Sequence, residues 1–356
     1  MAKKWTLAAM LLVVIALVGS ICWIYLAGLT PQPKAVTVRV GWLTGDLHDL
    51  PYFVAKNEAL DGGRSLYDKY NINVTDSNPL GYVNGPAAMD AFAAGEVDIG
   101  FIGLSPAITK HLNAGVNTTI IAEVNSLGSA IVTKYPIKSM HDLIGKTIAT
   151  PGPGTIQYFL LLRLAEMERI DVGNFSLIKL APKDMRLSME SGMIDAFIAW
   201  EPYCSDAVSS NVGTIYRNSS DIWPDHICCV VVVDNKFAKT HPDAVVNFLK
   251  AHIDATNWIK SAESSGTGSS DYNLLLETAA NFTGRNNAVI ELALRNVRYE
   301  FEINDTFKEC FIEFTQKLIQ YQIVPADAIQ ARGYEDVFSL ANKYINATYL
   351  TSAKQT

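Results

Sequence analysis

The chain has 356 residues, of which 49% are hydrophobic and 18% charged, and its formal net charge is −7. This length allows two domains of ordinary size, and the composition is typical of a globular protein. The sequence contains no run of Lys or Arg, which argues against a nucleic-acid partner. Because the overall charge is acidic, any binding of an anion must depend on local hydrogen-bond donors.

The N-terminal 35 residues carry a membrane-targeting pattern. Lys3 and Lys4 precede an uncharged stretch whose apolar core is about as long as a membrane span. The two lysines predict that the N-terminus faces the cytoplasm and the body lies outside. A cleaved signal peptide is the alternative. The predicted segments are a short cytoplasmic N-terminus at 1–4, a signal anchor or transmembrane helix at 5–29 and a linker at 30–35.

The next part of the chain alternates between strand and helix patterns. Residues 36–42 are mostly apolar and predict a first strand. The long loop that follows contains Asp46 and His48 and leads into a helix. The same alternation continues to about residue 131, which predicts a mostly parallel sheet covered by helices.

One pattern of helix, glycine, aspartate and strand occurs twice in the sequence. Its two copies span 87–102, with Gly95 and Asp98, and 185–199, with Gly192 and Asp195. In each copy the glycine suits the C-terminal cap of the helix. The pattern predicts two α/β lobes of similar plan, with the loops after their strands meeting at a shared cleft.

The segment 149–157, Ala-Thr-Pro-Gly-Pro-Gly-Thr-Ile-Gln, joins a predicted strand to a predicted helix. Its glycines and Thr155 leave backbone N–H groups free at a helix start, where negative charge is favoured. The segment matches neither a phosphate-binding loop nor a dinucleotide fingerprint. It contains no lysine, which predicts ligand binding without phosphate chemistry, and the alternative is a plain strand-to-helix connection.

Two β-branched runs, 129–133 and 228–233, predict strands that cross between the lobes. Helical patterns follow from 235 to 345 around a polar loop at 261–270, and we expect these helices to wrap the first lobe. The predicted division is lobe one at 36–130 and 234–350, and lobe two at 131–233.

The cysteines and the glycosylation motifs bear on the compartment. A disulfide between Cys204 and Cys228, or between Cys204 and Cys229, would fit an external location, and buried free thiols are the alternative. No CxxC spacing is present, which argues against a thiolate metal site. Asn-x-Ser/Thr sequons fit a glycosylated external surface. They begin at Asn73, Asn117, Asn174, Asn218, Asn281, Asn304 and Asn346.

Several short motifs, taken in order, carry a family resemblance. They are Gly95-Glu-Val-Asp-Ile-Gly100, Leu143-Ile-Gly-Lys-Thr-Ile-Ala149, Gly154-Thr-Ile-Gln157, Gly192-Met-Ile-Asp195, Ala199-Trp-Glu-Pro202 and Phe237-Ala-Lys-Thr-His-Pro-Asp243. With this order and spacing, residues 36–345 resemble the substrate-binding proteins of ABC importers for nitrate, sulfonates, taurine and thiamine-pyrimidine precursors. The resemblance implies an α/β fold, the two-lobed type II periplasmic-binding-protein clamshell, which closes on one small polar solute.

The same resemblance implies where the ligand binds. Carried over by position, the contacts are Asp46, His48, Ser105, Gly154, Thr155, Gln157, Trp200 and Glu201. The resemblance also implies an ABC permease with its ATPase subunits as partners. We expect a monomer without a cofactor.

Each of these residues has a structural alternative to ligand binding. Thr155 and Gln157 could serve only as helix caps, and Trp200 only as core. Ser105 could simply start a helix, and His48 could be an ordinary turn residue.

Glu201 stands apart from the other expected contacts because a carboxylate at a strand end needs a partner. It would either pair with Arg or Lys across the lobes or bind a cationic group of the ligand. The second case favours an amino-sulfonate or an N–H heterocycle over a plain anion such as nitrate.

No catalytic constellation is evident in the sequence, so we expect a binding protein and not an enzyme. One enzyme family of the same fold, the thiamine-pyrimidine synthases, uses a cysteine-rich segment with histidine and pyridoxal phosphate. Cys228-Cys229 with His226 is a weak echo of that segment. An anchored extracellular sensor or adhesion module is the third alternative.

Overall fold

The computed structural model describes residues 35–355. The predicted cytoplasmic N-terminus, the signal anchor and the linker, apart from Ala35, lie outside the described residues. Among the residues that are described, no helix is both long and apolar enough to cross a membrane.

The first sheet has six strands in the order β11-β4-β10-β3-β1-β2. β1 pairs in parallel with β2 and β3, whereas β10 is antiparallel to both β3 and β4, and β4 is antiparallel to β11. The expectation of a mostly parallel sheet therefore holds only for one half of this sheet. The strands are β1 (Val36–Gly41), β2 (Ile72–Asp76), β3 (Ile99–Gly103), β4 (Thr118–Leu127), β10 (Ile227–Asp234) and β11 (Val297–Tyr299).

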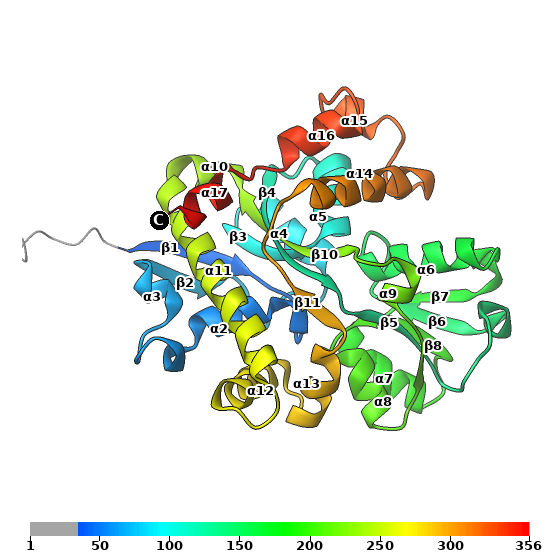
Figure 1. The fold of residues 1–356 in the computed structure, drawn as a ribbon. Helices are drawn as coiled ribbons and strands as arrows, with labels where there is room; N and C mark the ends of the chain where they lie inside the picture. The colour runs from blue at the N-terminus through cyan, green and yellow to red at the C-terminus, as the bar shows by residue number, and fades with distance from the viewer. Residues whose placement is uncertain (1–34, 356) are drawn as a thin grey trace, which may run out of the picture. The chain divides into compact units, whose positions relative to one another are not determined.

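The second sheet has five strands in the order β7-β6-β8-β5-β9. β6 is parallel to β7 and β8, and β5 is antiparallel to β8 and β9. Each sheet thus forms the centre of one lobe (Figure 1). The strands are β5 (Ser129–Thr133), β6 (Thr147–Thr150), β7 (Ser176–Lys179), β8 (Ala196–Trp200) and β9 (Thr214–Asn218).

The chain passes from the first sheet to the second at Gly128, which separates β4 from β5 and has φ +83°. It returns before Ile227, because β10 lies between β3 and β4 in the first sheet. The predicted end of lobe two at residue 233 therefore differs from the structure. The uncharged, β-branched composition of 228–233 identified a buried strand, but composition alone does not say which sheet the strand joins.

Helices surround both sheets (Figure 1). Those of the first lobe are α2 (Leu50–Lys56), α3 (Leu66–Lys69), α4 (Gly85–Ala93), α5 (Leu104–Ala114), α10 (Asn235–Thr240), α11 (Pro242–Ser265), α12 (Ser270–Thr283), α13 (Asn287–Leu294), α14 (Asp305–Gln320), α15 (Ala328–Ala331), α16 (Val337–Tyr344) and α17 (Thr348–Lys354). Those of the second lobe are α6 (Ile156–Met167), α7 (Pro182–Glu190), α8 (Tyr203–Ser209) and α9 (Ser219–Ile222). The predicted polar loop at 261–270 was too long, since α11 continues through Ser265.

The repeated glycine and aspartate have the same structural roles in both lobes. Gly95 follows α4 with φ +72°, and Gly192 follows α7 with φ +81°, a backbone region that glycine adopts without strain. The aspartates then bind the neighbouring parallel strand. Asp98 accepts from the backbone N–H of Arg39 in β1 (2.8 Å), and Asp195 accepts from that of Thr147 in β6 (2.9 Å).

α14 connects the two lobes, whereas we expected the C-terminal helices to wrap the first. Phe314 of α14 stacks on Phe159 of α6, with ring centroids 4.1 Å apart, and on Trp223 at 5.2 Å. Lys317 of the same helix pairs with Glu166. The amphipathic pattern of α14 predicted a buried face but not the lobe that would cover it.

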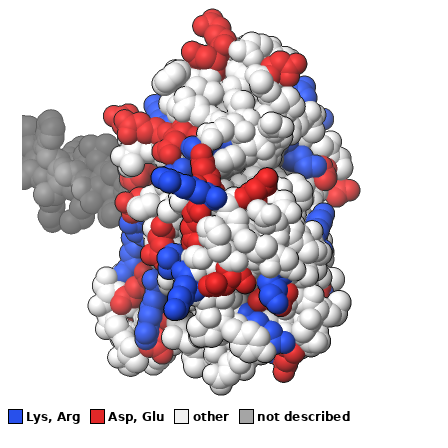
Figure 2. All heavy atoms as spheres, turned by 90° about the vertical axis from the view of Figure 1, so that its right-hand side faces the viewer, with Lys and Arg blue, Asp and Glu red and all other residues white. Residues whose placement is uncertain are grey.

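The face of the second lobe carries acidic and basic side chains interspersed with one another (Figure 2). This arrangement agrees with the absence of a basic run in the sequence.

Five sequon asparagines are exposed, and the other two, Asn218 and Asn346, are partly buried.

Candidate functional site

A small cavity lies where the ends of strands from both sheets meet the start of α6. Its volume is about 20 Å³, room for one water molecule or a single ion. The first sheet and its loops contribute one side, and α6 and Trp200 contribute the other. The lining residues are Leu43, Asp46, His48, Gly85, Gly103, Pro106, Thr155, Ile156, Gln157, Trp200, Cys228 and Cys229.

Five of the eight expected contact residues line this cavity, namely Asp46, His48, Thr155, Gln157 and Trp200. Three do not. Ser105 and Glu201 are buried nearby, and Gly154 lines a separate surface hollow together with Tyr158.

The loop after β1 folds into a short 3₁₀ turn at Leu47–Asp49, which positions His48. Asp46 caps this turn by accepting a hydrogen bond from the backbone N–H of His48 (3.0 Å). Asp49 accepts from the N–H of Leu43 (2.7 Å), and the N–H of Leu47 donates to the carbonyl of Glu201 (3.0 Å). The turn is therefore held by its own aspartates and by the second lobe.

The ring of His48 is fixed by the crossover between the lobes. Its Nε2 lies 3.0 Å from the carbonyl oxygen of Gly128, and since a carbonyl only accepts, Nε2 carries the hydrogen. The other ring nitrogen, Nδ1, faces Cys228 and Cys229 at 3.6 and 3.7 Å. The carboxylate of Asp46 lies 3.2 Å from the same Nδ1.

Asp46, His48, Cys228 and Cys229 form a buried cluster in which the pKa of each group depends on its neighbours. Burial raises the pKa of Asp46 to about 7, while the nearby imidazole limits the rise. Burial by itself would lower the pKa of His48, but Asp46 and Cys228 raise it to about 10. A hydrogen bond from the Cys229 thiol, together with His48, holds the pKa of Cys228 well below its usual range. A lowered thiol pKa beside an imidazole with a raised pKa is the combination found at activated thiols.

At the start of α6, Thr155 and Gln157 bond within the protein. The hydroxyl of Thr155 donates to the carbonyl of Gly152 (2.7 Å) and accepts from the N–H of Tyr158 (3.2 Å), so Thr155 is an N-cap. Gln157 donates from Nε2 to the hydroxyl of Ser129 (3.0 Å). Thr155 therefore acts as a helix cap, as the structural alternative predicted, and its side chain also borders the cavity. Gln157 does not cap the helix but bonds to Ser129 of β5.

Glu201 bonds across the lobes to an amide and not to the Arg or Lys that its position suggested. Its Oε1 accepts from Nδ2 of Asn296 (2.7 Å), and its Oε2 accepts from the N–H of Ser205 (3.0 Å). The side chain is fully buried, and burial raises its pKa. The Arg or Lys partner expected across the lobes is therefore replaced by an amide, while binding of a cationic ligand group by Glu201 stays a prediction.

Several buried polar atoms have no hydrogen-bond partner among the described residues, and two of them belong to expected contact residues. They are the indole Nε1 of Trp200, which lines the cavity, and the hydroxyl of Ser105. Because buried polar atoms are usually paired, such atoms in a cleft indicate a place for water or ligand.

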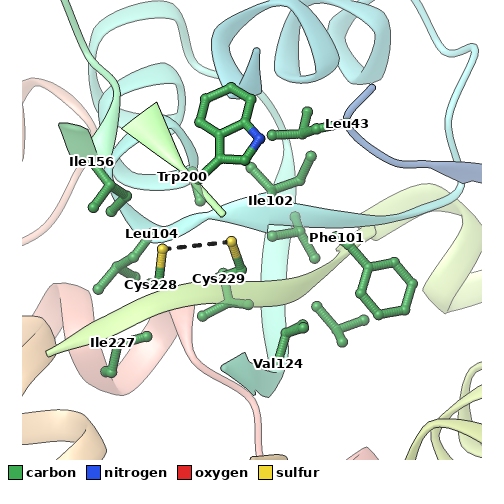
Figure 3. Close-up of a cluster of buried hydrophobic side chains, with 14 of the residues drawn as sticks. Leu43, Phe101, Ile102, Leu104, Val124, Ile156, Trp200, Ile227, Cys228 and Cys229 are labelled. Carbon is green, nitrogen blue, oxygen red and sulfur yellow. Dashed lines mark hydrogen bonds between the residues drawn. The ribbon is translucent and has the colours of Figure 1, made fainter. Parts of the chain in front are cut away.

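Cys228 and Cys229 were not among the expected ligand contacts. We expected Cys204 to form a disulfide with one of them or all three to be buried free thiols, and the structure has the free thiols. The thiol of Cys204 instead donates to the carbonyls of Ala199 (3.2 Å) and Ala130 (3.5 Å) within the second lobe. Figure 3 shows the sulfur atoms of Cys228 and Cys229 on one side of β10, below Trp200. The sequence feature that could have identified them as site residues was the pair of adjacent cysteines in a buried strand.

A family model described as the NMT1-like family matches residues 31–267. The chain belongs to this family. A similar curated protein is the taurine-binding periplasmic protein of Escherichia coli, 30% identical over 191 residues. The match covers 51% of this chain and 59% of that protein, so the chain spans less than two thirds of its relative.

Solved structures show the same fold. The periplasmic nitrate-binding protein NrtA from Synechocystis has a TM-score of 0.73 at 16% identity, with 91% of this chain and 89% of that chain covered. The alkanesulfonate-binding protein SsuA from Xanthomonas axonopodis, bound to MOPS, has a TM-score of 0.69 at 17% identity, with 83% and 96% covered. The predicted two-lobed α/β fold of periplasmic binding proteins is confirmed.

Proposed function

We propose that this NMT1-like protein is the extracytoplasmic substrate-binding component of an ABC importer, which captures one small polar solute between its lobes. The observation that carries the proposal is the cavity at the shared edge of the two sheets. Side chains from both lobes line it, among them His48 and Trp200. Ligands of open α/β sheets bind at such edges.

Two features support capture and release. The indole N–H of Trp200 is buried at the cavity without a partner among the described residues, so it is available to a ligand. The cavity of about 20 Å³ is far smaller than the ~300 Å³ of typical small-molecule pockets, so entry of a solute requires the lobes to part. Opening and closing about the Gly128 crossover is the hinge motion expected of such a protein.

The cellular context is also part of the proposal. The relatives named above are periplasmic or solute-binding proteins, which supports a body outside the cytoplasm. The proposal also includes an N-terminal anchor and a monomeric state. It further includes docking onto an ABC permease with its ATPase subunits. Exposed sequon residues such as Asn117 and Asn281 would then be open to glycosylation.

The enzyme alternative is not favoured. A thiamine-pyrimidine synthase would use its cysteine-rich segment with pyridoxal phosphate, whereas the relatives named above are binding proteins. His226, which sequence analysis placed beside Cys228-Cys229, does not line the cavity, and its Nδ1 lies 3.1 Å from the carbonyl of Ile227.

A ligand screen with two readouts tests the proposal. The purified full-length chain is mixed with taurine, alkanesulfonates, nitrate, thiamine pyrimidines and metal salts, and melting temperature and radius of gyration are measured. A ligand at 100 times its dissociation constant should stabilise the fold by about 2.7 kcal/mol and make the molecule more compact. If no compound in the panel changes either quantity, the capture function is wrong.

A further inference from the structure

Three buried side chains of the cavity form a compact set of metal-ligand atoms. Nδ1 of His48 lies 3.6 Å from Sγ of Cys228 and 3.7 Å from Sγ of Cys229, and the two sulfur atoms are 3.9 Å apart. All three residues are at most 3% exposed. Within the described residues, they are the one group of His, Cys, Asp or Glu residues with this spacing.

Adjacent strand residues normally point to opposite faces of a sheet, so two neighbouring cysteines on one side need an explanation. The pairing of β10 with β4 shifts register on both sides of Cys229, as at a β-bulge. A bulge re-aims side chains locally and is common next to binding sites. Both sulfur atoms therefore face the cavity side of β10 in Figure 3.

The separations agree with those around a tetrahedral metal ion. With metal–sulfur bonds of about 2.3 Å and metal–nitrogen bonds of about 2.0–2.1 Å, tetrahedral angles place two sulfurs about 3.8 Å apart and nitrogen and sulfur about 3.6 Å apart. The observed separations are 3.9, 3.6 and 3.7 Å. An ion could therefore enter with shifts of only a few tenths of an ångström.

The surroundings of His48 also resemble those of a metal ligand. A ligating histidine usually donates its second N–H to a carbonyl or carboxylate, which sets the ring orientation. Here Nε2 donates to the carbonyl of Gly128, so Nδ1 is the nitrogen aimed at the thiols. The carboxylate of Asp46 adds negative charge 3.2 Å from that nitrogen.

The charge and size of the cavity fit a cation better than a sulfonate or nitrate. No Lys or Arg belongs to its lining, whereas Asp46 and two thiols do. A buried anion here would meet the carboxylate of Asp46 without a Lys or Arg to pair with, and His48 already faces Asp46 and the thiols, so its burial would be energetically costly. In the closed lobes, about 20 Å³ accommodates one ion but no organic solute.

We propose that the cargo of this cleft is a single thiophilic divalent cation of the Zn²⁺ class, ligated by Nδ1 of His48 and the sulfurs of Cys228 and Cys229. This inference rests on the proposed capture function. Thiolate and imidazole ligands favour such ions over Mg²⁺ or Ca²⁺. The ion binds the deprotonated ligands, and the displaced protons leave to solvent. Three protein ligands leave a fourth position for water, which suits an ion that must later be released.

Metal titration of the reduced full-length chain tests the inference. We expect one equivalent of Zn²⁺ to bind and Co²⁺ to produce a thiolate-to-metal charge-transfer band that Zn²⁺ abolishes. Mg²⁺ should not compete. Cys228→Ser and Cys229→Ser should each weaken Zn²⁺ binding at least tenfold and remove or diminish the band.

Cys310→Ser is the matched control, since Cys310 lies in α14, does not line the cavity and should leave both readouts unchanged. Circular dichroism and melting curves without metal establish whether each variant is folded. If a serine variant does not fold, the corresponding alanine variant, Cys228→Ala or Cys229→Ala, takes its place. Equal Zn²⁺ affinity in the Cys228 and Cys310 variants, or no charge-transfer band, would overturn the inference.

The ligand screen separates this inference from the capture function. If taurine or nitrate compacts the chain while Zn²⁺ does not bind, the metal inference fails and the capture function stands. If nothing in the panel binds, both fail. If Zn²⁺ binds at the cluster and compacts the chain, both are supported.

Discussion

The side-chain amide of Asn296 donates a 2.7 Å hydrogen bond to Oε1 of Glu201, and the two residues belong to different lobes. Glu201 follows β8 of the second sheet, whereas Asn296 precedes β11 of the first. The backbone of Glu201 also joins the lobes, because its carbonyl accepts from the N–H of Leu47. These contacts hold the lobes together beside the cavity.

Asn296→Ala should destabilise the closed protein. The substitution leaves one oxygen of the buried Glu201 carboxylate without its partner, which costs about 1–3 kcal/mol. Urea unfolding measures the loss. The control is Asn113→Ala, which removes a hydrogen bond to the carbonyl of Ile323 from an exposed side chain. We expect a change within about 0.5 kcal/mol for the control, and equal losses in both variants would contradict the importance of the interlobe bond.

Gly128→Ala should disrupt the crossover and displace His48. A Cβ at Gly128 would lie 2.2 Å from Nε2 of His48, and the backbone has φ +83°. Gly145→Ala separates the two effects, since Gly145 has φ +74° but no atom within 4 Å of an added Cβ. We expect the control to lose about 1 kcal/mol through backbone strain alone. Gly128→Ala should lose clearly more, and should also weaken Zn²⁺ binding. Equal melting temperatures for the two variants would contradict this prediction.

His252 should make stability fall in acid. This residue is fully buried, and its Nε2 lies 2.9 Å from the carbonyl of Glu123. Burial lowers its pKa from 6.5 to about 4. Between pH 6.5 and 4 the unfolded chain binds a proton that the folded chain does not, so the free energy of unfolding decreases as pH falls. The contribution is about 3 kcal/mol over this window.

A histidine variant isolates this contribution, because other groups also titrate. Burial raises the pKa of Glu123 to about 7, and its effect has the opposite sign, since stability is lost as pH rises from 4.5 to 7. His252→Gln should therefore flatten the acid-side loss relative to the natural chain. His141→Gln, at an exposed position, should leave the profile as it is. Parallel profiles for the natural chain and His252→Gln would contradict the prediction.

Asp195→Ala should show that the repeated aspartate stabilises the sheet. Its carboxylate accepts from the backbone N–H of Thr147 at the start of β6, and loss of that partner costs about 1–3 kcal/mol. Asp90→Ala removes only an exposed ion pair with Lys110, for which we expect less than about 1 kcal/mol. Chemical unfolding of both variants makes the comparison. A smaller loss in Asp195→Ala than in Asp90→Ala would contradict this role.

Much of the fold was predictable because its signals are local. The helix that ends before Gly95, the one that ends before Gly192 and the strands after them follow from periodicity and glycine caps within about fifteen residues. Thr155 at the start of α6 is a cap of the same kind. Where local signals were ambiguous the predictions failed, as at 261–265, where a serine-rich sequence continues a helix.

The candidate site was only partly predictable. His48 and Trp200 were expected at the cleft from the family resemblance, and Trp200 also because it ends a strand of a predicted lobe. The partner of Glu201 was not predictable, because Asn296 lies 95 residues away and carries no sequence motif. The pairing of Cys204 with Cys228 failed because sequence proximity says nothing about which lobe each strand joins.

The sequence by itself determined two α/β lobes of one plan and a cleft where their strands end, since helix periodicity, strand composition and glycine caps act over short distances. Only the tertiary structure decided that β10 enters the centre of the first sheet and that its register shifts turn Cys228 and Cys229 toward His48, 180 and 181 residues away. Strand order and register are set by packing between distant segments, and a shift of one residue reverses the direction in which a side chain points.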